Sequence, residues 1–234
     1  MIKQRLIYRF ILKNRMRIFF VISCALLILF PISQHQDILP TSGVELFSNA
    51  LLLFGIYLVS PNKHLFAVSV LTSALAIVLI WSSKFYFSKH QLLFGLFLEG
   101  ILFMIAIYSI ILHVLTMRKI NEDKIFGAIS AYLLLCIFWA LIYTMTEIYD
   151  PYSFSFSTGF TTAYTSMAVH RFYFTQFLYF SFITFSTLGY GDILPLTAPA
   201  RIAASLQAVA GQLYVAILIA RLVGLQIIQS QKDH

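Results

Sequence analysis

Six long apolar runs constrain this chain more than any other feature of its sequence. A helix needs about 20 mostly apolar residues to cross the hydrocarbon core of a bilayer. The chain is 60% hydrophobic and only 11% charged, whereas a soluble domain carries about 25% charged residues. We therefore predict an all-α membrane protein with six transmembrane helices, at about 16–33, 44–60, 65–82, 92–117, 125–148 and 198–228.

A seventh apolar stretch, Tyr173 to Phe185, is shorter. Its length of about 13 residues is too short for a helix to cross the hydrocarbon core. Such a segment suits a re-entrant helix, which enters the membrane between two spans and does not cross it. We expect a re-entrant helix here, just before the sixth span.

Basic residues are unevenly distributed along the chain and predict its orientation. Six of the 16 Lys and Arg residues lie in the first 17 positions, namely Lys3, Arg5, Arg9, Lys13, Arg15 and Arg17. Before a membrane span, such a cluster marks the cytoplasmic side more often than a nucleic-acid site. With six spans, both termini are cytoplasmic and residues 149–197 face outward. The expected location is a cell membrane of the prokaryotic inner-membrane type, with lipids and no nucleic acid as partners.

The predicted organisation has three regions. Residues 1–17 form a basic cytoplasmic segment, which is either an amphipathic helix on the membrane surface or a flexible tail. Residues 18–117 form a four-helix membrane domain, and residues 118–234 form a second domain with two spans and the re-entrant helix. Among Asp, Glu, Lys, Arg and His, the fourth span contains only Glu99 and His113. A voltage sensor carries repeated Arg or Lys within one span, so classical voltage sensing is not expected.

The six residues Thr187 to Asp192, with the sequence TLGYGD, follow the re-entrant stretch. Backbone carbonyls can replace the hydration shell of K⁺ when successive residues point them at one axis. That backbone shape needs unusual φ angles, which Gly189 and Gly191 tolerate because they lack Cβ. Leu188 and Tyr190 can then turn their side chains into the surrounding protein, and Thr187 can add a hydroxyl oxygen.

One such segment cannot encircle an ion, so a complete site needs several copies of the chain. Four copies around an axis would form a closed ring of carbonyls, which predicts a homotetramer. The re-entrant helix would direct the negative end of its dipole at the axis and stabilise a cation there.

The region from about Ile125 to Ile228 resembles the pore module of the tetrameric potassium channel family. The run TLGYGD matches the T-x-G-Y-G-D filter of that family, with Leu188 where Val or Ile is more usual. The resemblance implies passive K⁺ conduction, with K⁺ bound at Thr187, Leu188, Gly189 and Tyr190, within the filter that Gly191 completes. Asp192 would then anchor the outer mouth. Pro195 and Arg201 also fall at positions that match the family.

The residues behind the filter depart from the family pattern. Tyr179 and Phe180 stand where the family often has two tryptophans. The Tyr179 hydroxyl can reach Asp192, whereas Phe180 has no donor for Tyr190. We expect Tyr190 to depend on Thr184 of a neighbouring subunit, and the filter to be less firmly braced.

The sixth span contains the candidate hinge and gate. Gly211 permits either a bend, as the resemblance implies, or close helix packing. Val223-Gly224 is a second possible bend, and Arg221 most simply extends to lipid headgroups. An apolar constriction that closes by dewetting is expected on one helical face, formed by Ile219, Ala220, Val223 and Ile227.

Several ionisable residues have two possible interpretations each. Glu99 either pairs with a neighbouring span or acts as a sensor. Glu147 and Asp150 either concentrate cations at the outer entrance or are ordinary solvated charges. His170 either senses pH, because histidine is the side chain that can change charge near neutral pH, or is an ordinary surface histidine.

Other functions remain as alternatives. These are a weakly selective cation channel, a K⁺ transporter subunit and a membrane enzyme. The spans contain no His, Cys, Asp or Glu cluster suited to a metal or to acid–base chemistry, so neither an enzyme nor an organic cofactor is expected. Cys24 and Cys136 are interpreted as small apolar residues. The sequence does not specify the gating stimulus.

Overall fold

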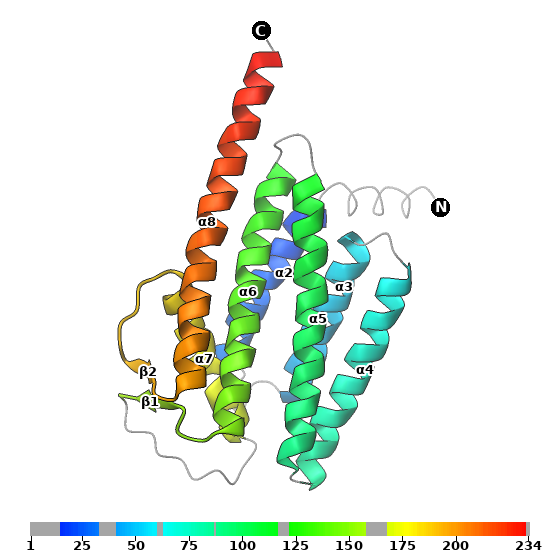
Figure 1. The fold of residues 1–234 in the computed structure, drawn as a ribbon. Helices are drawn as coiled ribbons and strands as arrows, with labels where there is room; N and C mark the ends of the chain where they lie inside the picture. Colours follow the sequence, from blue (N-terminus) through cyan, green and yellow to red (C-terminus); the bar gives the residue numbers. More distant parts are fainter. Residues whose placement is uncertain are drawn as a thin grey trace. The chain divides into compact units, whose positions relative to one another are not determined.

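The computed structural model describes residues 15–32, 41–59, 63–86, 88–116, 122–157 and 168–232. These residues are mostly helical (Figure 1). The elements are α2 (Arg15–Ile32), α3 (Thr41–Val59), α4 (Lys63–Tyr86), α5 (Lys89–Thr116), α6 (Glu122–Tyr149), β1 (Phe154–Phe156), α7 (Ala168–Phe185), β2 (Ile193–Pro195) and α8 (Ala198–Lys232).

Within the described ranges, four helical segments are long and apolar enough to cross a membrane. They are Lys63–Ser83, Lys89–Thr116, Glu122–Tyr149 and Ala198–Arg221. These segments coincide with the third to sixth predicted spans. Helices α2 and α3 coincide with the first two, whose membrane crossing remains a prediction. Most of the basic N-terminal cluster lies outside the described residues.

The chain divides into two compact units. Unit 1 comprises Met1–Leu71, Leu102–Leu134 and Leu218–His234, and unit 2 comprises Thr72–Ile101 and Leu135–Ile217. The boundaries between them fall inside α4, α5, α6 and α8, so each of these helices contributes to both units. This division follows spatial compactness, and the predicted division at residues 17 and 117 remains a prediction.

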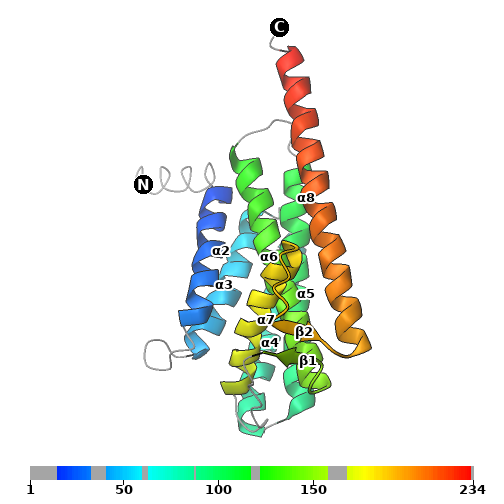
Figure 2. The same cartoon turned by 90° about the vertical axis from the view of Figure 1, so that its left-hand side faces the viewer.

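In unit 1, α2 packs beside α3, as Figures 1 and 2 both show. The buried ring of Phe19 lies against Gly55, where a side chain would collide with it. At the start of α2, Arg15 hydrogen-bonds His113 of α5 at 2.8 Å. Arg17 forms an exposed ion pair with Glu122 at the start of α6. The first turn of α2 is thus tied to two other helices.

In unit 2, an aromatic cluster holds α6, α7 and β1 together. The ring of Tyr143 in α6 lies 5.5 Å from that of Phe154 and 5.0 Å from that of Phe180, measured between centroids. The ring of Phe177 in α7 lies 4.6 Å from that of Phe154. Large buried rings contribute much of the packing energy of a core. This cluster therefore sets where α7 lies.

A short antiparallel pair of strands is the one departure from the all-α prediction within the described residues. Phe154 pairs with Pro195, and Phe156 pairs with Ile193. Both views show these strands next to α7 (Figures 1 and 2). The pair joins the segment after α6 to the segment just beyond residues 187–192.

Candidate functional site

The segment Thr187 to Asp192 follows the end of α7 in an irregular conformation. Thr187, Gly189 and Gly191 have φ values of 60°, 52° and 78°. Every second residue is therefore left-handed, and two of the three are glycines, which adopt this conformation without a steric cost. The left-handed conformation at the β-branched Thr187 costs roughly 1–3 kcal/mol, and its surroundings must hold it there.

The last turn of α7 holds the start of this segment. The N–H groups of Leu188 and Gly189 both donate to the carbonyl of Ile183, at 2.8 and 3.1 Å. The N–H of Thr187 donates to the carbonyl of Thr184 at 3.1 Å. These bonds use carbonyls that a helix end would otherwise leave without a partner. The side chains of Leu188 and Tyr190 are 55% and 68% exposed in the single chain.

Tyr179 and Asp192 interact behind the segment. The Tyr179 hydroxyl donates a hydrogen bond to the Asp192 carboxylate, and this bond, with minor contributions from desolvation and nearby negative charge, raises the pKa of Tyr179 to about 12. The sequence predicts contact between these two residues. The neighbouring residue Phe180 is 5% exposed and packs against Tyr143 and Phe154.

The far end of the segment is held by the strand pair. The N–H of Ser157 donates to the carbonyl of Asp192 at 2.9 Å, and the N–H of Leu196 donates to the carbonyl of Ser153 at 2.8 Å. The hydroxyls of Thr197 and Ser153 lie 3.2 Å apart. Residues immediately after Gly191 are therefore fixed by backbone bonds within the same chain.

Glu147 has a different role from either sequence interpretation. It is only 1% exposed, so it is neither a solvated charge nor a charge facing the entrance. Its two carboxylate oxygens accept hydrogen bonds from the N–H groups of Tyr152, at 2.9 Å, and Phe154, at 3.1 Å. Tyr152 is left-handed, with φ 68°. The buried carboxylate thus holds the turn that leads into β1.

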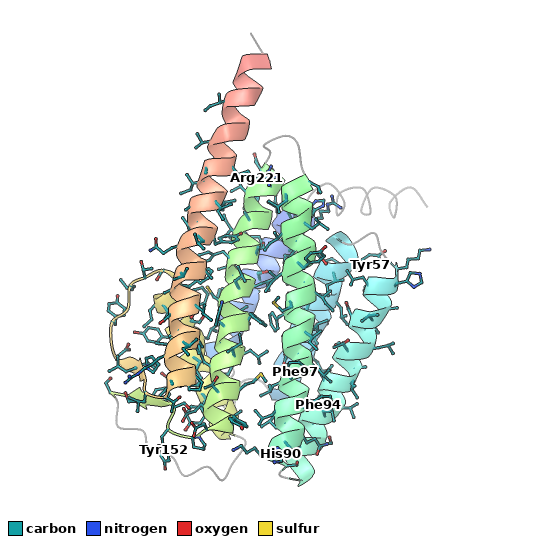
Figure 3. All side chains as sticks on the ribbon, viewed as in Figure 1. Tyr57, His90, Phe94, Phe97, Tyr152 and Arg221 are labelled. Carbon is teal, nitrogen blue, oxygen red and sulfur yellow. The ribbon has the colours of Figure 1, made fainter. Side chains whose placement is uncertain are left out.

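Figure 3 shows Tyr152 at the same end of unit 2 as His90, near the start of α5. A contact between nearby residues agrees with this placement, because Lys89 donates from Nζ to the carbonyl of Tyr149 at 2.8 Å. The turn after α6 is therefore connected to α5 as well as to β1.

A buried polar network that the sequence analysis missed joins α6, α7 and α8. Gln207 of α8 donates from Nε2 to the carbonyl of Ser181 at 3.1 Å and to its hydroxyl oxygen at 2.6 Å. The Tyr143 hydroxyl donates to Gln207 Oε1. The Ser181 hydroxyl donates to the Cys136 carbonyl at 2.7 Å. In the sequence, Gln207 is one of several glutamines in this helix, and nothing distinguishes it from the others.

The structure favours close packing at Gly211. A Cβ atom there would lie 2.5 Å from the carbonyl oxygen of Phe185 and 3.0 Å from its ring. Around Gly224, by contrast, no atom of the described residues lies within 4 Å of such an atom. Helix α8 runs without interruption through both glycines.

The four candidate gate residues all lie in the C-terminal half of α8. Ile219, Val223 and Ile227 are 50–55% exposed, and Ala220 is also exposed. The Arg221 guanidinium donates to the carbonyl of Leu115 near the end of α5. Its extension to lipid headgroups stays a prediction. Figure 3 labels Arg221 in this region.

The remaining ionisable candidates are placed as follows. Glu99 is half-buried on α5 and engages in an interaction there. His113 bonds Arg15, and the side chain of His170 lies outside the described residues. No group of three His, Cys, Asp or Glu residues suited to a metal occurs in the described ranges of the chain.

One comparison with known proteins gives a match. Residues 131–225, less than half of the chain, match a family model described as "Ion channel". Neither the curated proteins nor the solved structures contain a match. The matched region contains most of α6, all of α7, the segment 187–192 and most of α8. Together with the apolar helices, it supports a membrane protein of an ion channel type that conducts ions passively, rather than an enzyme.

Proposed function

We propose that this protein is a potassium channel subunit, and that four copies surround one K⁺-selective pore. The observation that carries this proposal is the backbone of residues 187–192. Three left-handed residues, Thr187, Gly189 and Gly191, alternate with the other residues of TLGYGD after the end of α7. This is the conformation expected of a strand that presents several carbonyl oxygens to one ion.

The ion would be held by the backbone oxygens of Thr187 to Gly191 and by the Thr187 hydroxyl. K⁺ is then the permeant ion, and no organic cofactor is involved. Asp192, which accepts a hydrogen bond from Tyr179, would support the outer end of the filter. Tyr190 would take its hydrogen bond from Thr184 of a neighbouring subunit.

The homotetramer is supported by how little of α8 a single chain buries. Only 11% of the most apolar stretch of this helix is buried within the chain. Five residues at spacings of three or four along it are each more than half exposed, namely Ile202, Leu206, Val209, Leu213 and Ile217. Leu188 and Tyr190 are exposed as well. Neighbouring subunits and lipid would cover these surfaces.

A gate is expected at the inner end of α8, at Ile219, Ala220, Val223 and Ile227. The stimulus that opens it is not specified by any of these residues. Both termini would be cytoplasmic, in a multi-pass protein of the cell membrane.

The decisive experiment measures reversal potentials of the purified protein in planar bilayers with unequal K⁺ and Na⁺. We expect the potential to follow the K⁺ gradient. Gly191→Ala should abolish K⁺-selective current in assembled protein, because alanine is strained at φ 78°. A potential that follows K⁺ and Na⁺ equally would favour a weakly selective cation channel. A potential insensitive to K⁺ would rule out the proposal.

A further inference from the structure

The buried amide of Gln207 is fully satisfied by partners on two other helices. Gln207, Tyr143 and Ser181 are each 0% exposed. The amide oxygen accepts from Tyr143, and the amide nitrogen has two acceptors on Ser181. Buried polar groups are costly unless they are paired, and an apolar residue would pack here without that requirement. The network therefore favours one position of α8 relative to α7.

A second contact lies one helical turn further along both helices. Gln207 meets Ser181, and Gly211 meets the carbonyl of Phe185. On each helix the two contact residues are four positions apart, so the contacts lie on one face of α8 and one face of α7. Helix α8 thus packs along the last turn of α7.

The last turn of α7 also holds the start of residues 187–192, the candidate filter. Ile183 lies between Ser181 and Phe185, and its carbonyl accepts the N–H groups of Leu188 and Gly189. A shift of α8 at Gln207 would therefore move this last turn of α7. The N–H groups of residues 187–189 are hydrogen-bonded to carbonyls of that turn, so they would move with it. The path from Gln207 to that backbone is short, because it passes only through Ser181 and Ile183.

We propose that Gln207 is a positioning residue of the pore, which transmits the position of α8 to the filter through Ser181. This inference rests on the proposed K⁺ conduction. Gln207 acts without touching the ion, because its amide is occupied by Ser181 and Tyr143. Displacement of α8 then changes how long the filter stays conducting.

Three variants and one control test this role. Gln207→Leu removes the amide that forms hydrogen bonds with the Tyr143 hydroxyl and the Ser181 carbonyl. Tyr143→Phe removes one bond and keeps the other two. The triple variant Tyr143→Phe/Ser181→Ala/Gln207→Leu removes the three polar side chains together, and removing both partners of a buried bond costs less stability than removing one. The control is Thr144→Val, because the buried Thr144 hydroxyl bonds the Ala140 carbonyl of its own helix.

Each variant is tested for assembly by gel filtration and for the length of conducting periods in planar bilayers, at high and low K⁺. We expect Gln207→Leu to shorten conducting periods about tenfold at low K⁺, and Tyr143→Phe about threefold. High K⁺ should lengthen them again, because an ion bound to the conducting filter favours that state by mass action. A purely structural defect would not respond to K⁺ in this way.

The triple variant separates positioning from stability. We expect it to assemble like the unmodified protein and still show short conducting periods, whereas Thr144→Val should behave like the unmodified protein. Normal conducting periods in the assembled triple variant, or in Tyr143→Phe if the triple variant does not assemble, would overturn the proposal. If the unmodified protein shows no K⁺-dependent reversal potential, the proposed function itself fails.

Discussion

At the scale of single residues, the site depends on side chains that form hydrogen bonds to the segments next to residues 187–192. Glu147 accepts two N–H groups of the turn before β1, and Tyr179 holds Asp192. The Tyr179 contact could be predicted, because a hydroxyl stands where the potassium channel family that this region resembles often has an indole N–H. The role of Glu147 could not, because an acid at the end of an apolar run looks the same in sequence whether it faces water or a turn.

Tyr179→Phe should shorten the conducting state about threefold, because it removes a hydrogen bond to the Asp192 carboxylate. The effect should depend on pH. The pKa of Tyr179 is raised from 10.0 to about 12, so the neutral hydroxyl stabilises the folded site below about pH 10. That contribution is lost as the pH rises through about 12.

Thermal unfolding of the assembled protein across this alkaline range provides the measurement. The Tyr179→Phe variant should lose less stability over this pH range than the unmodified protein does, because it lacks the titrating hydroxyl. Tyr57→Phe is the matched control, since Tyr57 is an exposed tyrosine of α3 in unit 1. Identical alkaline profiles for the unmodified protein and Tyr179→Phe would contradict this expectation.

At the scale of secondary-structure elements, long helices were predictable and short strands were not. Apolar runs of about 20 residues specify helices because the membrane leaves the backbone few other ways to pair its polar groups. The strands β1 and β2 have three residues each, and their pairing depends on the fold that brings Phe154 to Pro195. The Gln207 network was missed for the same reason, because its partners lie 26 and 64 positions away.

Gly211→Ala should destabilise the assembled protein by about 1–3 kcal/mol, because the added methyl group overlaps the Phe185 carbonyl. The matched control is Gly224→Ala in the same helix, where no atom of the described residues lies within 4 Å of the added methyl group. Alanine favours helix by about 1 kcal/mol over glycine, so this control should be neutral or stabilising.

Both glycine variants are compared by thermal unfolding and by gel filtration. If Gly211 serves mainly as a hinge, Gly211→Ala would instead assemble normally and change only opening. Equal stability of the two variants would therefore argue against the close packing described for Gly211.

At the scale of the whole molecule, the charges within the spans limit the stimuli that can open the pore. The fourth predicted span, which is α5, contains no Arg or Lys after Lys89. Glu99 is half-buried within it. The packing of the first four predicted spans could not be read from hydropathy, because apolar runs specify length and not neighbours.

We expect weak voltage dependence. If Glu99 crossed the whole membrane field in each of four subunits, at most about four elementary charges would move per channel. Conductance measured over voltages of both signs should then change gradually. A steep curve that requires on the order of ten charges per channel would show that another segment of the chain moves in the field.

The strand pair has a consequence for how a pore would be assembled. Strands β1 and β2 lie on either side of α7 and residues 187–192 in the sequence, and they join the two ends of that segment into a closed loop within one chain. The entropy of closing the loop is therefore lost during folding of the subunit. Each subunit would bring a finished quarter of the filter to its neighbours, so that assembly aligns four preformed loops and does not have to shape them.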